Sequence, residues 1–125
     1  MAKGDDIQER LTNFAVGIIQ LCEKMPDSNS GRHVANQLLR CGTSPAPNYG
    51  EARGAESKRD FVHKLGVVLK ELNESHIWLE TIQRSNLLAA KFLAPLLAEC
   101  TELSRIINAS ISTAKEKRQR SIAND

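Results

Sequence analysis

Apolar side chains recur at steps of three and four residues along almost the whole chain, the spacing that places them on one face of an α-helix. Four such stripes predict helices over residues 5–25, 30–52, 57–84 and 90–118. No alternating strand pattern competes with them. The four stripes comprise Ile7, Leu11, Phe14, Ile18, Leu21 and Met25; Val34, Leu38 and Cys41; Phe61, Leu65, Val68, Leu72, Ser75, Leu79 and Ile82; and Leu93, Leu96, Cys100, Leu103, Ile107, Ser110 and Ala114.

Polar and helix-breaking residues separate these stripes. Long helices joined by short polar turns are typical of an antiparallel up-and-down bundle. We therefore expect an all-α protein that forms a single four-helix-bundle domain over residues 1–125. The candidate N-caps are Asp5 and Asp6 for the first helix, Ser28 or Ser30 for the second, and Ser57, in a capping box with Asp60, for the third.

The stretch "RCGTSPAPNYGEA", residues 40–52, interrupts the second helix. Pro45 and Pro47 each remove a helical hydrogen bond, at a cost of about 3 kcal/mol in a helix interior, so they predict a kink. The hydroxyls of Thr43 and Ser44 favour bending by bonding back to the preceding turn. The stretch lacks the G-K-[ST] ending and the preceding strand of a phosphate loop, which leaves a lone backbone anion site as the alternative.

If the second helix continues through this kink, its polar residues form a row along one face. The third helix carries a matching row. We expect Arg40 to pair with Glu71 or Glu74, because a guanidinium can hold a carboxylate with two hydrogen bonds, and Asn48 to bridge the two rows. The residues of this predicted structural row, at or near a subunit contact, are Arg40, Ser44, Asn48, Glu51, Glu71, Glu74 and Trp78.

The third helix has more apolar positions than one stripe requires. A helix that is apolar over most of its circumference is usually buried on more than one side. In a four-helix monomer the surplus would face water, so we interpret it as a subunit interface. The alternative is that long lysine and glutamate side chains cover it. The surplus positions are Val62, Val67, Leu69, Ile77 and Trp78.

Charge is nearly balanced, with a net charge of +2 that is too small to indicate a nucleic-acid-binding protein. The excess lies in the last segment, "KEKRQRSIAND", which has four basic residues and two acidic ones. Such a cluster either contacts phosphates or is a solvated helix end whose cations suit the helix dipole. The candidate nucleic-acid contacts are Arg53, Lys58, Arg59, Lys115, Lys117, Arg118 and Arg120.

Candidate chemistry is sparse. Cys22, Cys41 and Cys100 form no C-x-x-C pair, which favours reduced thiols in a cytoplasmic protein. No apolar run is long enough for a transmembrane helix, and the N-terminus lacks a signal-peptide core. The three histidines share no metal-ligand spacing, so we expect neither a metal nor a cofactor. We assign no catalysis, and the paired carboxylates Glu71 and Glu74 are the remaining acid–base alternative.

Two segments carry a family resemblance. "NQLLRCGTSPAPNYGEA" and "ESKRDFVHKLGVVLKELNESHIWLE" together resemble the bacterial four-helix-bundle family of the 23S rRNA intervening-sequence protein over residues 32–82. Cys41 stands where that family usually has serine. The matching positions are Asn36, Gln37, Leu38, Arg40, Gly42, Ser44, Asn48, Glu51, Ala52, Ser57, Asp60, Phe61, Lys70, Glu71, Glu74, Trp78 and Leu79.

The resemblance implies a left-handed antiparallel bundle that assembles into a ring, a homopentamer, and it implies no established reaction. A related branch, the accessory protein of diversity-generating retroelements, binds nucleic acid through a strongly basic surface. Two hypotheses follow. The first is a non-enzymatic homo-oligomeric scaffold or interaction module. The alternative is an RNA- or DNA-binding accessory protein whose weak basic patches gain avidity by repetition around a ring.

Overall fold

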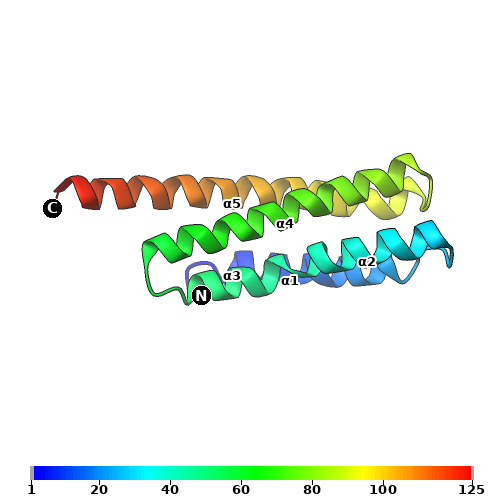
Figure 1. The fold of residues 1–125 in the computed structure, drawn as a ribbon, viewed down its shortest axis with the longest axis horizontal. Helices are drawn as coiled ribbons and strands as arrows, with labels where there is room; N and C mark the ends of the chain where they lie inside the picture. The colour runs from blue at the N-terminus through cyan, green and yellow to red at the C-terminus, as the bar shows by residue number, and fades with distance from the viewer. Residues whose placement is uncertain (1, 125) are drawn as a thin grey trace.

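The computed structural model describes residues 2–124, and every regular element in that range is a helix (Figure 1). The predicted all-α class is therefore confirmed. The first helix ends three residues earlier than the sequence predicts, and the last continues six residues further. The helices are α1 (Asp5–Cys22), α2 (Asn29–Thr43), α3 (Pro45–Arg53), α4 (Lys58–Arg84) and α5 (Ala90–Asn124).

The helices occupy four corners, because α2 and α3 form one bent rod (Figure 1). Within the described residues, α1 and α4 each contact α2, α3 and α5, but α1 does not contact α4, and α5 contacts neither α2 nor α3. Thus α1 lies diagonally opposite α4. Neighbouring helices run antiparallel, which confirms the four-helix bundle. The left-handed sense of the bundle stays a prediction.

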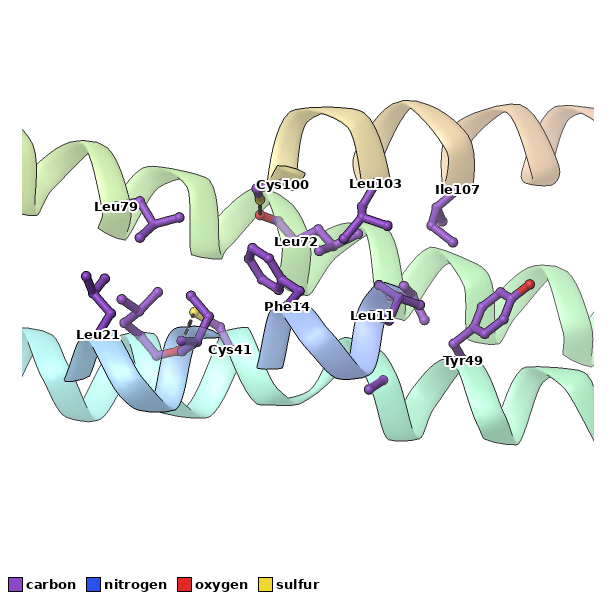
Figure 2. Close-up of a cluster of buried hydrophobic side chains, with 14 of the residues drawn as sticks. Leu11, Phe14, Leu21, Cys41, Tyr49, Leu72, Leu79, Cys100, Leu103 and Ile107 are labelled. Carbon is purple, nitrogen blue, oxygen red and sulfur yellow. Dashed lines mark hydrogen bonds between the residues drawn. The ribbon is translucent and has the colours of Figure 1, made fainter. Parts of the chain in front are cut away.

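The core consists of the apolar stripes that the sequence marks. Leu11, Leu72 and Leu103, from three different helices, are completely buried, and Figure 2 shows their side chains pointing into the space between the helices. Burial of each such side chain stabilises the fold by about 1.5–3 kcal/mol. Ser75 occupies its predicted place in the α4 stripe, where its hydroxyl donates to the Glu71 carbonyl oxygen at 2.7 Å. That bond lets a polar side chain lie in an aliphatic core.

The ends of the helices agree only partly with the sequence. Ser28 and Ser57 cap α2 and α4, as predicted. The prediction that Asp5 and Asp6 cap α1 is wrong, because the N-cap is Gly4, with a φ of 91°. Asp5 already lies in the first turn of α1, where its carboxylate accepts a hydrogen bond from the Ala2 amide at 2.8 Å.

The junction of α2 and α3 is a bend, not a loop. Ser44 keeps helical dihedrals, with φ −76° and ψ −36°, and Pro45 follows at the first position of α3, where its missing N–H is not needed. The Asn48 side-chain amide donates to the Ser44 carbonyl and hydroxyl oxygens at 2.9 and 2.8 Å. From α1, the Gln8 amide donates to the Ala46 carbonyl at 2.9 Å. The kink predicted near Pro45 and Pro47 is confirmed.

The surplus apolar positions of α4 are mostly covered by the chain itself. Val62, Val67, Leu69 and Trp78 are half-buried, because α4 packs against α5 on one flank and against α2 and α3 on the other. The expectation that a monomer would leave all of them facing water is therefore wrong. Ile77, on the outward side of α4, is the exception, with 63% of its surface exposed.

Helices α1 and α2 approach each other closely at Gly42, so we expect a side chain at this position to destabilise the fold. A Cβ at Gly42 would lie 2.8 Å from both Ile18 Cγ1 and Cγ2, inside the packed core. Gly42→Ala should therefore lower the free energy of unfolding, because overpacking costs about 1–3 kcal/mol and exceeds the gain in helix propensity. Chemical denaturation measures the change.

Gly66→Ala in α4 is the matched control for this substitution. A Cβ at Gly66 would meet no described atom outside its own helix within 4 Å. The control should therefore gain about 0.5–1 kcal/mol from helix propensity alone. Equal gains for the two variants would contradict tight packing at Gly42.

Candidate functional site

The predicted polar row exists along the junction of α2 and α4. The Arg40 guanidinium contacts the carboxylates of both Glu71, at 3.4 Å, and Glu74. It also donates to the Gln37 side chain at 3.3 Å. The predicted pairing of Arg40 is therefore confirmed for both glutamates.

This ion-pair cluster lies at the surface of the monomer. The Arg40 side chain is 52% exposed, although that of Glu71 is only 15% exposed. Partial desolvation disfavours the charged form of Arg40, but the Glu74 and Glu71 carboxylates outweigh it, so the pKa of the guanidinium is raised. Solvent screens such pairs, so in the monomer the row is a polar surface and not a buried network.

Further contacts extend the row along α4. The Trp78 indole donates to Glu74 Oε2 at 3.2 Å, and the rings of Trp78 and His33 form a T-shaped pair with the centroids 6.1 Å apart. Toward the other end, Lys64 pairs with Glu51 at 3.0 Å. The row thus spans the length of the α2–α3 rod.

One residue of the row, Asn48, has a different role from the predicted one. Asn48 was expected to bridge the two helices, but the structure contradicts this, because both hydrogen bonds of its amide nitrogen go to Ser44 on the same rod. Ser44 and Asn48 therefore stabilise the bend at Pro45. Whether the remaining residues of the row lie at a subunit contact stays a prediction.

The three thiols are poor nucleophiles. Burial raises the pKa of Cys22 to about 11 and that of Cys100 to about 12, and it also raises the pKa of Cys41. At neutral pH these groups are almost entirely protonated, whereas the thiolate is the reactive form. Among residues 2–124, no three His, Cys, Asp or Glu side chains come together as a metal site would require.

A groove opens at the end of the bundle where α1 begins. Its volume is about 730 Å³, and it lies between α5, the end of α3, the first turn of α4 and the residues before α1. We call it the end groove. Tyr49 and Phe61 contribute aromatic rings to it, and Figure 2 shows the Tyr49 side chain pointing away from α3. The described residues that line it are Lys3, Gly4, Tyr49, Arg53, Lys58, Phe61, Arg105, Ile106, Ala109, Ser110, Thr113, Ala114 and Lys117.

The end groove gathers some of the predicted nucleic-acid contacts and not others. Arg53, Lys58 and Lys117 line it, although Lys117 is far from the other two in the sequence. Arg53 already pairs with Asp5 at 2.6 Å, an interaction that lowers the pKa of the Asp5 carboxyl. The remaining four predicted contacts are exposed side chains that do not line the groove, namely Arg59, Lys115, Arg118 and Arg120.

Two cations of the end groove are absent from the sequence-based prediction. Lys3 precedes the first helix, and Arg105 lies in the middle of the fourth apolar stripe, so neither belongs to a charge cluster in the sequence. The sequence did contain a signal for an open surface at this end of the bundle, because the predicted fourth helix is longer than the predicted first helix. Part of the apolar stripe of the fourth helix must therefore extend beyond the first helix.

The fold defines a class: small, antiparallel helical bundles. Residues 5–109 match the family described as 23S rRNA-intervening sequence protein, and the chain belongs to this family. The family resemblance is thus confirmed.

One solved structure extends the comparison. It is a protein of unknown function from the S23 ribosomal protein family, from Bacteroides thetaiotaomicron, and it is 30% identical in sequence. The alignment covers 84% of this chain and 97% of that one, with a TM-score of 0.79. No curated protein is significantly similar to the chain.

None of the helices in the described range is long and apolar enough to cross a membrane.

The contacts of the polar row predict different effects on the melting temperature for two surface cations, Arg40 and Lys117. Arg40→Ala should lower the melting temperature more than Lys117→Ala does, because it removes the cation that lies between two carboxylates, whereas Lys117 pairs with no carboxylate of the described residues. Differential scanning calorimetry measures both variants. Equal melting temperatures would show that the row is merely a solvated face.

The raised thiol pKa values generate a second prediction. Cys22, which is half-buried, should react first with an aromatic disulfide reagent at mildly alkaline pH, and Cys41 and Cys100 should react only on unfolding. Absorbance of the released thiolate follows the reaction, and Cys22→Ser identifies the first phase. Rapid labelling of Cys100 in the native protein would contradict its burial.

Proposed function

We propose that this protein is a non-enzymatic scaffold that assembles into a homo-oligomeric ring. The observation that carries the proposal is the presence of exposed apolar side chains at two separate places on the bundle, one on α1 and α2 and the other on α4. Exposed apolar clusters on a small protein commonly mark interaction surfaces. A pentamer is the assembly that the family resemblance implies.

The first apolar surface lies on α1 and α2. Ile19 and Leu39 are 44% and 39% exposed. They lie at the same level of the bundle, because the neighbouring Ile18 packs against Gly42 and the Cys22 thiol reaches the Ala35 carbonyl at 3.5 Å. Val16, one turn before Ile19, is also exposed.

The second apolar surface lies on α4. It consists of Ile77 and the accessible part of Trp78, two of the five residues that the sequence marks as surplus. The two surfaces are made of different residues, and α1, which carries most of the first, does not contact α4. Two different surfaces favour a head-to-tail contact, which closes into a ring when the rotation permits.

The absence of an assigned reaction is part of the proposal. The two carboxylates considered for acid–base chemistry, Glu71 and Glu74, are both engaged by Arg40. The thiols are held protonated by burial. Both observations support a structural role over a catalytic one. We also expect a cytoplasmic location, as the reduced cysteines indicate.

Charge substitutions at the two surfaces test the ring. The unmodified protein should have the mass of several 13.8 kDa chains by light scattering, with five expected. Leu39→Glu and Ile77→Glu should each reduce that mass, because burying a carboxylate in an apolar contact is costly. Ile122→Glu on α5 is the matched control, because Ile122 is as exposed as Ile77.

Mixing the two variants decides the geometry of the contact. In a head-to-tail ring, Leu39→Glu retains an intact α4 surface and Ile77→Glu an intact α1–α2 surface, so the mixture should form a one-to-one heterodimer. If only one substitution disrupted assembly, the contact would join identical surfaces and no ring would follow. A monomeric unmodified protein at micromolar concentration would overturn the proposal.

A further inference from the structure

The end groove arises because α5 is longer than its partner α1. The row of α5 residues that faces α1, which we call the seam, begins with Leu96 and Glu99. Leu96 lies over Gly17. The Glu99 carboxylate accepts two hydrogen bonds from the Arg10 guanidinium, at 2.6 and 3.0 Å. By alternating steps of three and four residues, the same seam continues through Ile106, Ser110, Thr113 and Lys117, which line the end groove.

One corner of the bundle is therefore unfilled at this end. Helix α1 begins at Asp5, whereas α3 and the first turn of α4 still flank the groove, and Figure 1 shows α5 extending past the other helices. From Arg105 to Lys117 the groove follows α5 for about 18 Å at 1.5 Å per residue, or just over three turns. These dimensions match a short helix in the corner that α1 leaves.

The floor of the groove suits a close helical contact. Ala109, Thr113 and Ala114 are small, so a second helix can approach the α5 backbone, while Phe61 and Ile106 supply larger apolar surface. A ligand held only by its charges, such as a phosphate backbone, would leave this floor uncovered. The lining therefore favours a partner that has an apolar face of its own.

The charge of the contact surface on α5 reverses beyond Asp5, the residue at which α1 begins. Along α1 the charged contact from α5 is Glu99, but the groove beyond it is rimmed by cations, and none of the described residues that line it is acidic. Two of the five cations are partly neutralised, because Arg53 pairs with Asp5 and Arg105 with Glu102. Lys3, Lys58 and Lys117 pair with no carboxylate in the described part of the chain, so the rim favours an acidic partner.

The C-terminal end of α5 from a second copy does not meet this requirement. Its exposed end carries Lys115, Lys117, Arg118 and Arg120, which would meet the cationic rim with like charge. The occupant must therefore come from another protein, or from a different part of this one. The groove residues from Ser110 onward also lie outside the residues that match the family.

We propose that the end groove binds an acidic amphipathic helix of a partner protein, which continues the corner position of α1. Leu and Ala side chains on one face of that helix cover Ile106, Ala109 and Phe61. Its carboxylates pair with Lys3, Lys58 and Lys117. This inference is independent of the proposed ring, because none of the apolar side chains on which the ring rests lines the groove.

Three synthetic peptides of about 16 residues, roughly four turns, test the chemistry of the occupant. The first has Leu and Ala on one helical face and Glu on the other, the second has Lys in place of every Glu, and the third is the acidic peptide with two internal prolines that prevent a helix. Fluorescence anisotropy of the labelled peptides with the full chain should show binding of the first alone. Added salt should weaken that binding.

Substitutions in the groove locate the site. Lys58→Glu and Lys117→Glu should each weaken binding of the acidic peptide about fivefold or more, because each removes an attraction and adds a repulsion. Ala109→Glu should weaken it similarly by placing a carboxylate on the apolar floor. Lys70→Glu, at an exposed position on α4 outside the groove, is the matched control and should leave binding unchanged. All four positions are exposed, and melting temperatures check that each variant folds.

Four results with the peptides and variants would overturn the proposal, and a fifth would come from an oligonucleotide. The first four are no binding of the acidic peptide, equal binding of the proline peptide, binding that the groove substitutions do not change, and a lower mass of the protein on Lys58→Glu, which would make the groove a subunit contact. Tighter binding of a single-stranded oligonucleotide that is lost in the same variants would assign the groove to nucleic acid instead. The mass of the Leu39→Glu and Ile77→Glu variants tests the ring separately, so the two proposals can fail independently.

Discussion

Burial of one aliphatic stripe from each corner in a common core determines how every helix of this bundle is rotated. Once Leu72 and Leu103 face the centre, the flanks of α4 must face α5 on one side and the α2–α3 rod on the other. That rotation brings Glu71 and Glu74 to Arg40, and it leaves Ile77 on the outside. The polar row and the exposed apolar surface are both consequences of the same packed core.

The unequal lengths of the helices shape the other notable surface. Residues of α5 that follow the heptad spacing pack on α1 only as far as α1 extends, and beyond Asp5 the same seam lies open. A helix end without tertiary contacts is only marginally stable in water, because isolated helices depend on packing. A second helix packed on the open part of α5 would therefore stabilise it, and this part of α5 presents apolar side chains beside a cationic rim. In the same way, the exposed surfaces on α1, α2 and α4 are apolar seams that lack a partner within one chain.

Much of the fold could be predicted from the sequence, because periodicity reports directly on which residues share a helix face. Even Ser75 was correctly placed in the core, although it is polar. Errors arose where a side chain had several partners within reach. Asn48 bonds to the nearby Ser44 and does not span to α4, and Asp5 lies one position too late to cap α1. Local hydrogen bonds of this kind depend on the helix register, which spacing alone leaves uncertain by a residue or two.

By itself, the sequence determined that the chain is helical, where each helix lies and which stripe is buried, because a period of 3.6 residues admits one amphipathic solution. It also marked Arg40 and its glutamates as partners. Only the tertiary structure decided which flank of each helix meets which neighbour, and hence that Val62 and Leu69 are covered within one chain. It alone brought Lys3 and Arg105 into one groove, because residues about a hundred positions apart become neighbours only through the packing of whole helices.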